Sequence, residues 1–88
     1  MIDIRFYVSG QTPRYIKAGK DIKDLLEGNY EGQYSFEIIN LTENPQRAEE
    51  DNIFVTPTLL RASPEPVKKV VGDFSNKEIV MKALDGFK

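Results

Sequence analysis

The strongest constraint on the fold is an alternating apolar pattern, followed at once by a capped helix and a second strand. Apolar side chains recur at every second residue near the start of the chain, at Ile2, Ile4, Phe6 and Val8. This period predicts a strand with one strongly apolar face. Thr12 can cap a helix that begins at Pro13, and Gly28 is typical of a helix end. Another strand is predicted to begin at Tyr34, so the three elements predict a right-handed unit with parallel strands.

The rest of the chain predicts a short helix, two strands and a last helix. Asn44-Pro45 repeats the cap-then-proline signal and opens a helix of about Pro45 to Asp51. An antiparallel hairpin is predicted next, with one strand from Thr56 to Arg61, a turn that contains prolines, and a second strand from Val67 to Gly72. Ser75 and Glu78 form a capping box before a helix predicted to bury Val80, Ala83, Leu84 and Phe87.

The predicted order is strand, helix, strand, helix, strand, strand, helix. A chain of 88 residues is long enough for one domain only, which we expect to span residues 1–88. One mixed sheet with helices packed on it is the thioredoxin-like α/β architecture. The sequence therefore predicts this fold class.

Two segments in the second half also fit the opposite type of structure. The predicted strand contains residues at helical spacing, namely Val67, Val70, Val71 and Phe74. The predicted last helix contains residues that alternate as in a strand, namely Ile79, Met81 and Ala83. Short apolar runs are often ambiguous in this way, and that is the ordinary explanation. The other explanation is that the second half can adopt two folds of similar energy.

Composition excludes several classes of function. The chain has no Cys and no His, so it offers no thiol chemistry, no imidazole base and no usual zinc site. Ser9 and Thr12 are the only candidate hydroxyl nucleophiles at the start of the first predicted helix, and neither has an activating base nearby in sequence. Tyr7 and Tyr15 are predicted to pack in the core or at an interface. We expect no catalytic residues, no cofactor and no metal.

Charge and hydropathy indicate where such a chain acts. The chain carries 12 basic and 14 acidic residues, and the basic ones are scattered, which argues against nucleic-acid binding. No apolar run approaches the ~20 residues that span a membrane. The first residues lack the pattern of a signal peptide. We therefore expect a cytoplasmic protein.

Four motifs, in the correct order, resemble one known family. They are Phe6 to Pro13, Asn44 to Ile53, Thr56 to Leu59, and Val71 to Glu78. All four are similar to motifs of the KaiB family, the circadian clock proteins, and the resemblance runs from about Ile4 to Leu84. Because four separate motifs agree in order, the resemblance is far more specific than any one of them.

The resemblance implies a regulatory binding protein that is not an enzyme. KaiB proteins bind the KaiC ATPase ring through a fold-switched thioredoxin-like monomer, and they sequester KaiA. They are metamorphic, because a ground-state fold with a different second half self-associates, which implies a dimer or tetramer here. The alternative function is a redox-inactive thioredoxin-like interaction domain with a stress-related or unrelated partner.

The resemblance also implies two sets of site residues. The fold-switch set is Pro57, Val71, Gly72 and Asp73, and a thioredoxin-like fold favours a cis bond before Pro57. The partner-binding set is Asn44, Pro45, Arg47, Glu49, Glu50 and Asp51. Each set has an ordinary interpretation. Gly72 can simply supply a positive φ at a strand-to-helix turn with Asp73 at the helix N-terminus, and the acidic run can be a solvated helix face.

Overall fold

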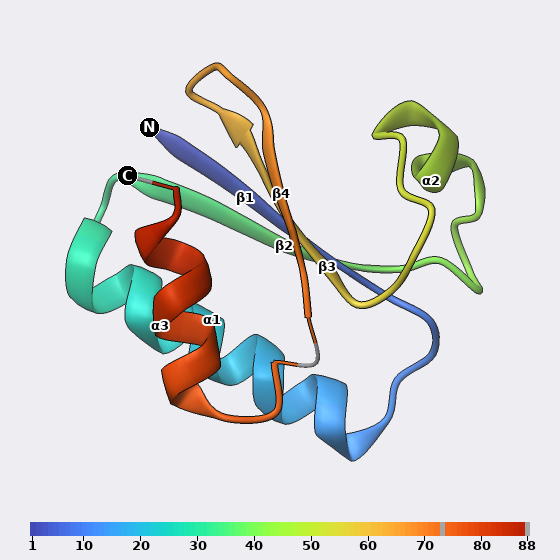
Figure 1. Ribbon diagram of the computed structural model, residues 1–88, viewed down its shortest axis with the longest axis horizontal. Helices are drawn as coiled ribbons and strands as arrows, with labels where there is room; N and C mark the ends of the chain where they lie inside the picture. Colours follow the sequence, from blue (N-terminus) through green and yellow to red (C-terminus); the bar gives the residue numbers. More distant parts are fainter. Residues whose placement is uncertain (73, 88) are drawn as a thin grey trace.

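The elements of the computed structural model, which describes residues 1–72 and 74–87, follow the predicted order (Figure 1). In chain order they are β1 (Ile2–Val8), α1 (Pro13–Tyr30), β2 (Tyr34–Asn40), α2 (Gln46–Glu50), β3 (Thr58–Ser63), β4 (Lys68–Val71) and α3 (Lys77–Asp85). The two ambiguous segments of the second half take one form each, a strand at β4 and a helix at α3.

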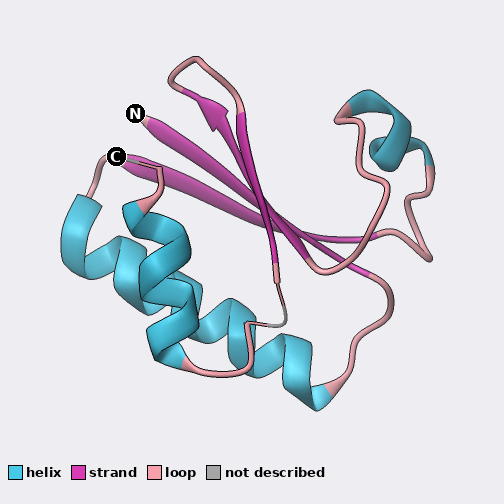
Figure 2. Cartoon of the chain, viewed as in Figure 1, coloured by secondary structure: helices cyan, strands magenta, loops and turns pink. Residues whose placement is uncertain are grey.

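The strands form one mixed sheet in the order β2-β1-β3-β4. β1 and β2 are parallel, with Ile2 opposite Tyr34 and Val8 opposite Asn40. β3 runs antiparallel to both of its neighbours and forms the predicted hairpin with β4. Figure 2 shows α1 and α3 side by side along the sheet, with the short α2 at the far end of the molecule.

The two faces of the sheet bury different clusters. The apolar face of β1 packs under α1 and α3, where Ile4, Phe6 and Phe74 are almost fully buried. The rings of Phe6 and Phe74 meet edge to face, with centroids 5.4 Å apart. A smaller cluster lies on the opposite face and consists of Tyr7, Ile39, Ile53 and Leu60. Val80, Ala83, Leu84 and Phe87 are buried as the sequence predicted.

Helix α1 begins where the sequence predicts but ends later. Thr12 is its N-cap, and its hydroxyl accepts a hydrogen bond from the Tyr15 amide at 3.3 Å. The expected stop at Gly28 is wrong, because the helix continues to Tyr30. The Asn29 side chain donates to the Leu25 carbonyl at 2.7 Å within the last turns. The chain reverses at Gly32 instead, whose φ of 72° suits glycine.

The predicted caps of α2 and α3 are each displaced by one residue. Pro45, not Asn44, occupies the N-cap of α2, and it makes no side-chain capping bond. Asn44 instead donates from its side chain to the Asn40 carbonyl at 3.4 Å. In α3 the cap is Asn76, which accepts from the Ile79 amide at 3.0 Å. Because α3 begins at Lys77, the Ser75–Glu78 pair is out of register for a capping box.

The turn into α3 differs from the ordinary interpretation of Gly72. The left-handed φ of this turn, 50°, belongs to Phe74, whereas the φ of Gly72 lies outside that region. Asp73 lies outside the described residues. A buried aromatic residue with positive φ is unusual, and here the ring contact with Phe6 holds it in place.

Arg61 is a buried cation on the helix-facing side of β3, opposite Ile4. Only 5% of it is exposed, and its guanidinium donates to the backbone carbonyls of Pro66, at 2.7 Å, and Phe87. Its Nε has no partner among the described residues. Arg61 therefore ties the β3–β4 turn to the chain that follows α3.

Candidate functional site

Helix α2 has only five residues, so its position depends on tertiary contacts. Ala48 and Ile53 pack with the cluster around Tyr7 on the sheet face opposite α1 and α3. The helix ends in a Schellman motif, with Asn52 at a φ of 56°. Its two bonds run from the Asn52 amide to the Glu49 carbonyl at 3.3 Å and from the Ile53 amide to the Ala48 carbonyl at 2.8 Å.

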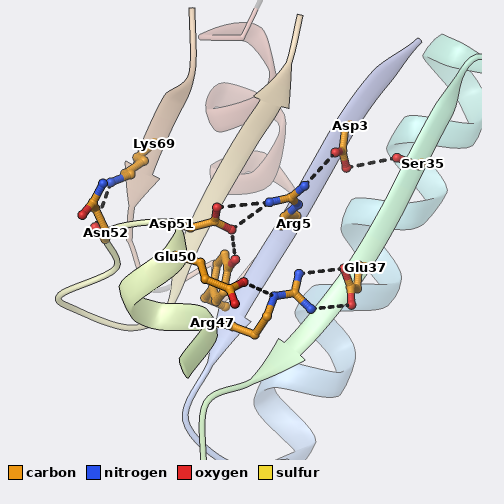
Figure 3. A network of polar contacts seen from close by, with 10 residues as sticks. Asp3, Arg5, Ser35, Glu37, Arg47, Glu50, Asp51, Asn52 and Lys69 are labelled. Carbon is orange, nitrogen blue, oxygen red and sulfur yellow. Dashed lines mark hydrogen bonds and ion pairs between the residues drawn. The ribbon is translucent and has the colours of Figure 1, made fainter. Parts of the chain in front are cut away.

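Asp51, which follows α2, is held by two side chains of β1 (Figure 3). Arg5 Nη1 donates to Asp51 Oδ1 at 3.1 Å and to Oδ2 at 2.9 Å. The Tyr7 hydroxyl also donates to Asp51 Oδ2. Arg5 Nη2 donates to Asp3 Oδ2 at 3.1 Å, and Asp3 Oδ1 accepts a hydrogen bond from the Ser35 hydroxyl at 3.0 Å.

The protonation equilibria reflect this network. Burial raises the pKa of Tyr7 to about 12, and the hydrogen bond to Asp51 adds to the rise. Burial alone disfavours the charged form of Asp51. The hydrogen bonds from Tyr7 and Arg5 outweigh that effect, so the pKa of Asp51 is lowered. The Asp51 carboxylate is therefore charged at neutral pH and retains its donors.

Arg47 makes a second connection between α2 and the sheet. Its guanidinium forms a fork with Glu37 of β2, with Nη1 to Oε2 at 3.2 Å and Nη2 to Oε1 at 3.1 Å. This fork raises the pKa of Arg47 and lowers that of Glu37. Arg47 Nε also lies 3.6 Å from a carboxylate oxygen of Glu50.

The structure divides the predicted partner-binding residues into two groups. Arg47 and Asp51 are directed at the sheet, as Figure 3 shows. Glu49 and Glu50 are exposed on α2, and Asn44 and Pro45 are exposed just before it. The exposed group is available to meet another molecule, and the contacts that Arg47 and Asp51 make with the sheet position it.

Three of the predicted fold-switch residues, Pro57, Val71 and Gly72, lie at one end of the β3–β4 hairpin. Thr58 pairs with Val71, so Pro57 and Gly72, their chain neighbours, lie at the same end. The Thr56–Pro57 bond is cis, and 57% of Val71 is exposed. Asp73, the fourth member of the set, lies outside the described residues.

Phe54 is a candidate contact residue that sequence reasoning missed. It follows α2 and is 91% exposed, while Ile53 beside it is buried. Ile53, Phe54 and Val55 form one apolar run, so the sequence offers no signal that separates the buried residue from the exposed ones. We call Glu49, Glu50 and Phe54 the α2 surface.

The Ser9 and Thr12 hydroxyls of the loop before α1 both have neutral hydrogen-bond partners. Ser9 Oγ lies 2.8 Å from Thr56 Oγ1, so its partner is another neutral hydroxyl rather than a base. A cleft of about 300 Å³ lies beside this loop, with Gly10, Tyr15 and Asn40 among its lining residues.

Within residues 1–72 and 74–87, no cluster of acidic side chains is arranged to hold a metal ion. In that same part of the chain, no helix combines the length and apolar character needed to cross a bilayer.

Comparison with known proteins agrees with the resemblance seen in the sequence. A family model described as the KaiB domain matches residues 5–85. The circadian clock oscillator protein KaiB of Microcystis aeruginosa is 44% identical over 82 residues, covering 93% of this chain and 79% of the relative. KaiB1 of Synechocystis is also 44% identical, over 93% of this chain and 78% of its own length.

Solved structures support the fold. The N-terminal domain of Synechococcus elongatus SasA aligns with a TM-score of 0.73 at 19% identity, covering 93% of this chain and 78% of that one. Thioredoxin O2 of Arabidopsis thaliana aligns with a TM-score of 0.74 at 12% identity, covering 98% and 74%. The predicted thioredoxin-like fold is confirmed.

Proposed function

Since this chain belongs to the KaiB family of non-enzymatic clock proteins, we propose that it is a regulatory protein that binds a KaiC-type ATPase ring. The observation that carries the proposal is the 44% identity to clock oscillator proteins across 93% of the chain. The thioredoxin-like fold supports it, because this is the form that the family resemblance links to ring binding. The system is a circadian clock or one derived from it, and a KaiA-type protein is a further partner.

The contact with the ring is made by the α2 surface, flanked by Asn44 and Pro45. Its two carboxylates and one exposed aromatic ring combine charge with a large apolar side chain. Interfaces typically use such a ring as an anchor and the charges for orientation. Arg47 and Asp51 contribute by positioning α2, because both are engaged with the sheet.

The second half of the chain also adopts another fold that self-associates as a dimer or tetramer. The ambiguous patterns around Val67 to Phe74 and Ile79 to Ala83 support this part of the proposal. The switch involves Pro57, Val71, Gly72 and Asp73. A Cβ placed on Gly72 would lie 3.9 Å from the Phe74 ring, an ordinary contact, so the thioredoxin-like fold accommodates Gly72→Ala. A changed monomer-to-oligomer ratio of this variant in size exclusion supports the assignment, and an unchanged ratio removes it.

The binding test is size exclusion and interferometry with a purified KaiC-type ATPase and nucleotide. The wild-type chain is expected to form a complex slowly, because the competent conformer is a minor one. Phe54→Ala should weaken binding by about thirtyfold or more, the size of an interface hot spot. Glu50→Arg should weaken it as well.

Asp24→Arg is the matched control, since Asp24 is exposed and belongs to α1, a helix that lies apart from α2 (Figure 1). This charge reversal should leave binding unchanged. Equal losses in Asp24→Arg and Glu50→Arg would mean that net charge, not the α2 surface, governs association. A wild-type chain that never binds the ring would favour the alternative of a thioredoxin-like interaction domain with another partner.

A further inference from the structure

We propose that Tyr7 and Arg5 are positioning residues that hold Asp51 and thereby fix the orientation of the α2 surface. This inference rests on the proposed function only for its effect on binding. The structural link connects Asp51 to Tyr7, 44 positions before it in the chain, and to Arg5, 46 positions before it. Neither residue belongs to the α2 surface itself.

Tyr7 is a rigid support for this link. Its side chain is fully buried in the central part of the sheet, because β1 is flanked by β2 on one side and β3 on the other. Ile39 and Leu60 pack in the same cluster as the ring. The hydroxyl at the end of this fixed ring donates to Asp51 and so defines one point where the end of α2 must lie.

The Asp51 contact is more protected from solvent than the Arg47–Glu37 fork, which also connects α2 to the sheet. The Asp51 side chain is 16% exposed, whereas Glu37, the partner of Arg47, is 53% exposed. Ion pairs in contact with solvent contribute little, and partly buried charged hydrogen bonds contribute more. The three donor contacts from Tyr7 and Arg5 therefore hold α2 more firmly than the Arg47–Glu37 fork does.

The chain geometry carries this constraint to the contact residues. Asp51 directly follows Glu50, and Phe54 lies three positions further on, after the Schellman turn at Asn52 and the buried Ile53. Release of Asp51 leaves the segment held by the buried Ile53 and by two solvent-exposed links, the Arg47–Glu37 fork and the bond from Lys69 to the Asn52 carbonyl. Glu49, Glu50 and Phe54 then sample more orientations, and binding must restrict them again at a cost in affinity.

The decisive variant is Tyr7→Phe, which removes one hydroxyl and keeps the ring. Hydrogen exchange of the free protein should become about tenfold faster at the amides of residues 46–54, with unchanged rates in α1. Binding to the KaiC-type ATPase should fall about tenfold, the lower end of what one charge-assisted hydrogen bond contributes. Asp51→Asn should have a similar effect, and the double variant should be no worse than either single one.

Tyr34→Phe is the matched control, because Tyr34 also donates to a carboxylate, that of Glu27 at 2.5 Å, but away from α2. This variant should change neither exchange at residues 46–54 nor binding. If Tyr7→Phe destabilises the whole chain, Arg5→Gln replaces it as the test variant. This change removes the two hydrogen bonds from the half-buried Arg5 guanidinium to Asp51.

The two proposals fail in different ways. Unchanged exchange at residues 46–54 in both Tyr7→Phe and Arg5→Gln would overturn the positioning role. Faster exchange with full binding affinity would also overturn it, because α2 would then not need a fixed position. A wild-type chain without affinity for the ATPase would defeat the proposed function, while the exchange measurement would still decide whether Asp51 holds α2.

Discussion

The edge-to-face contact of Phe6 and Phe74 joins the two halves of the chain, and its strength can be measured. Phe6 lies in β1, whereas Phe74 lies in the turn before α3. Both rings are almost fully buried. The perturbation is Phe→Leu at each position, separately and together, because Leu keeps most of the apolar volume and removes the ring edge.

The expected magnitude follows from the geometry. A chain of 88 residues has a free energy of unfolding of roughly 4–13 kcal/mol. Phe→Ala in a core costs about 3–5 kcal/mol and could unfold such a chain, whereas a swap that nearly conserves volume costs below about 1.5 kcal/mol. A ring pair at 5.4 Å and 90° is expected to contribute about 0.5–1.5 kcal/mol beyond its buried area.

The assay is urea unfolding of the wild type, both single variants and the double variant, followed by far-UV circular dichroism. The double variant should be more stable than the sum of the single losses predicts, by about 0.5–1.5 kcal/mol. Phe54→Leu is the control, because this ring is 91% exposed and its replacement should change stability by less than about 0.5 kcal/mol. Losses that add to within ~0.3 kcal/mol would refute this contact as the packing of the free protein.

Three further predictions concern single residues. Gly28→Ala should raise the free energy of unfolding by about 0.5–1 kcal/mol, because Gly28 lies within α1 and a Cβ added there would meet open space; a lower urea midpoint would mean that α1 ends there. In a titration followed at 295 nm, Tyr7 should ionise near pH 12, and its contribution to stability should be complete below about pH 10 and disappear as pH rises through 12; persistence of that step in Tyr7→Phe would contradict the assignment. Arg61→Lys should lower stability by about 1–3 kcal/mol in thermal unfolding, because one ammonium group cannot serve the carbonyls of both Pro66 and Phe87; a neutral result would show that these bonds contribute nothing net.

The first half of the fold could be predicted because its signals are local. The alternation from Ile2 to Val8 and the Thr12-Pro13 cap each act within a few residues, and both are confirmed. The exact helix ends were harder to predict. Gly28 tolerates a helical backbone as well as a terminating one, and the Asn29–Leu25 bond favours continuation.

The candidate site could be predicted only in part, because its geometry depends on contacts between distant residues. The motif from Asn44 to Ile53 locates the segment but not which side chains face outward. Asp51 is turned inward by Arg5 and Tyr7, and Ile53 by the cluster around Tyr7. No local periodicity in the sequence reveals such contacts between distant residues. The sequence alone therefore does not show which residues of the acidic run contact the sheet and which are exposed.

The Tyr7–Asp51 hydrogen bond limits which other conformations this sequence can adopt. Its donor belongs to the first half of the chain and its acceptor to the second. A rearrangement that moves Asp51 away leaves the hydroxyl of the buried Tyr7 without its acceptor, which costs about 1–3 kcal/mol. Any alternative conformation with a comparable population must therefore supply a new acceptor for Tyr7 or open a path for water to reach it.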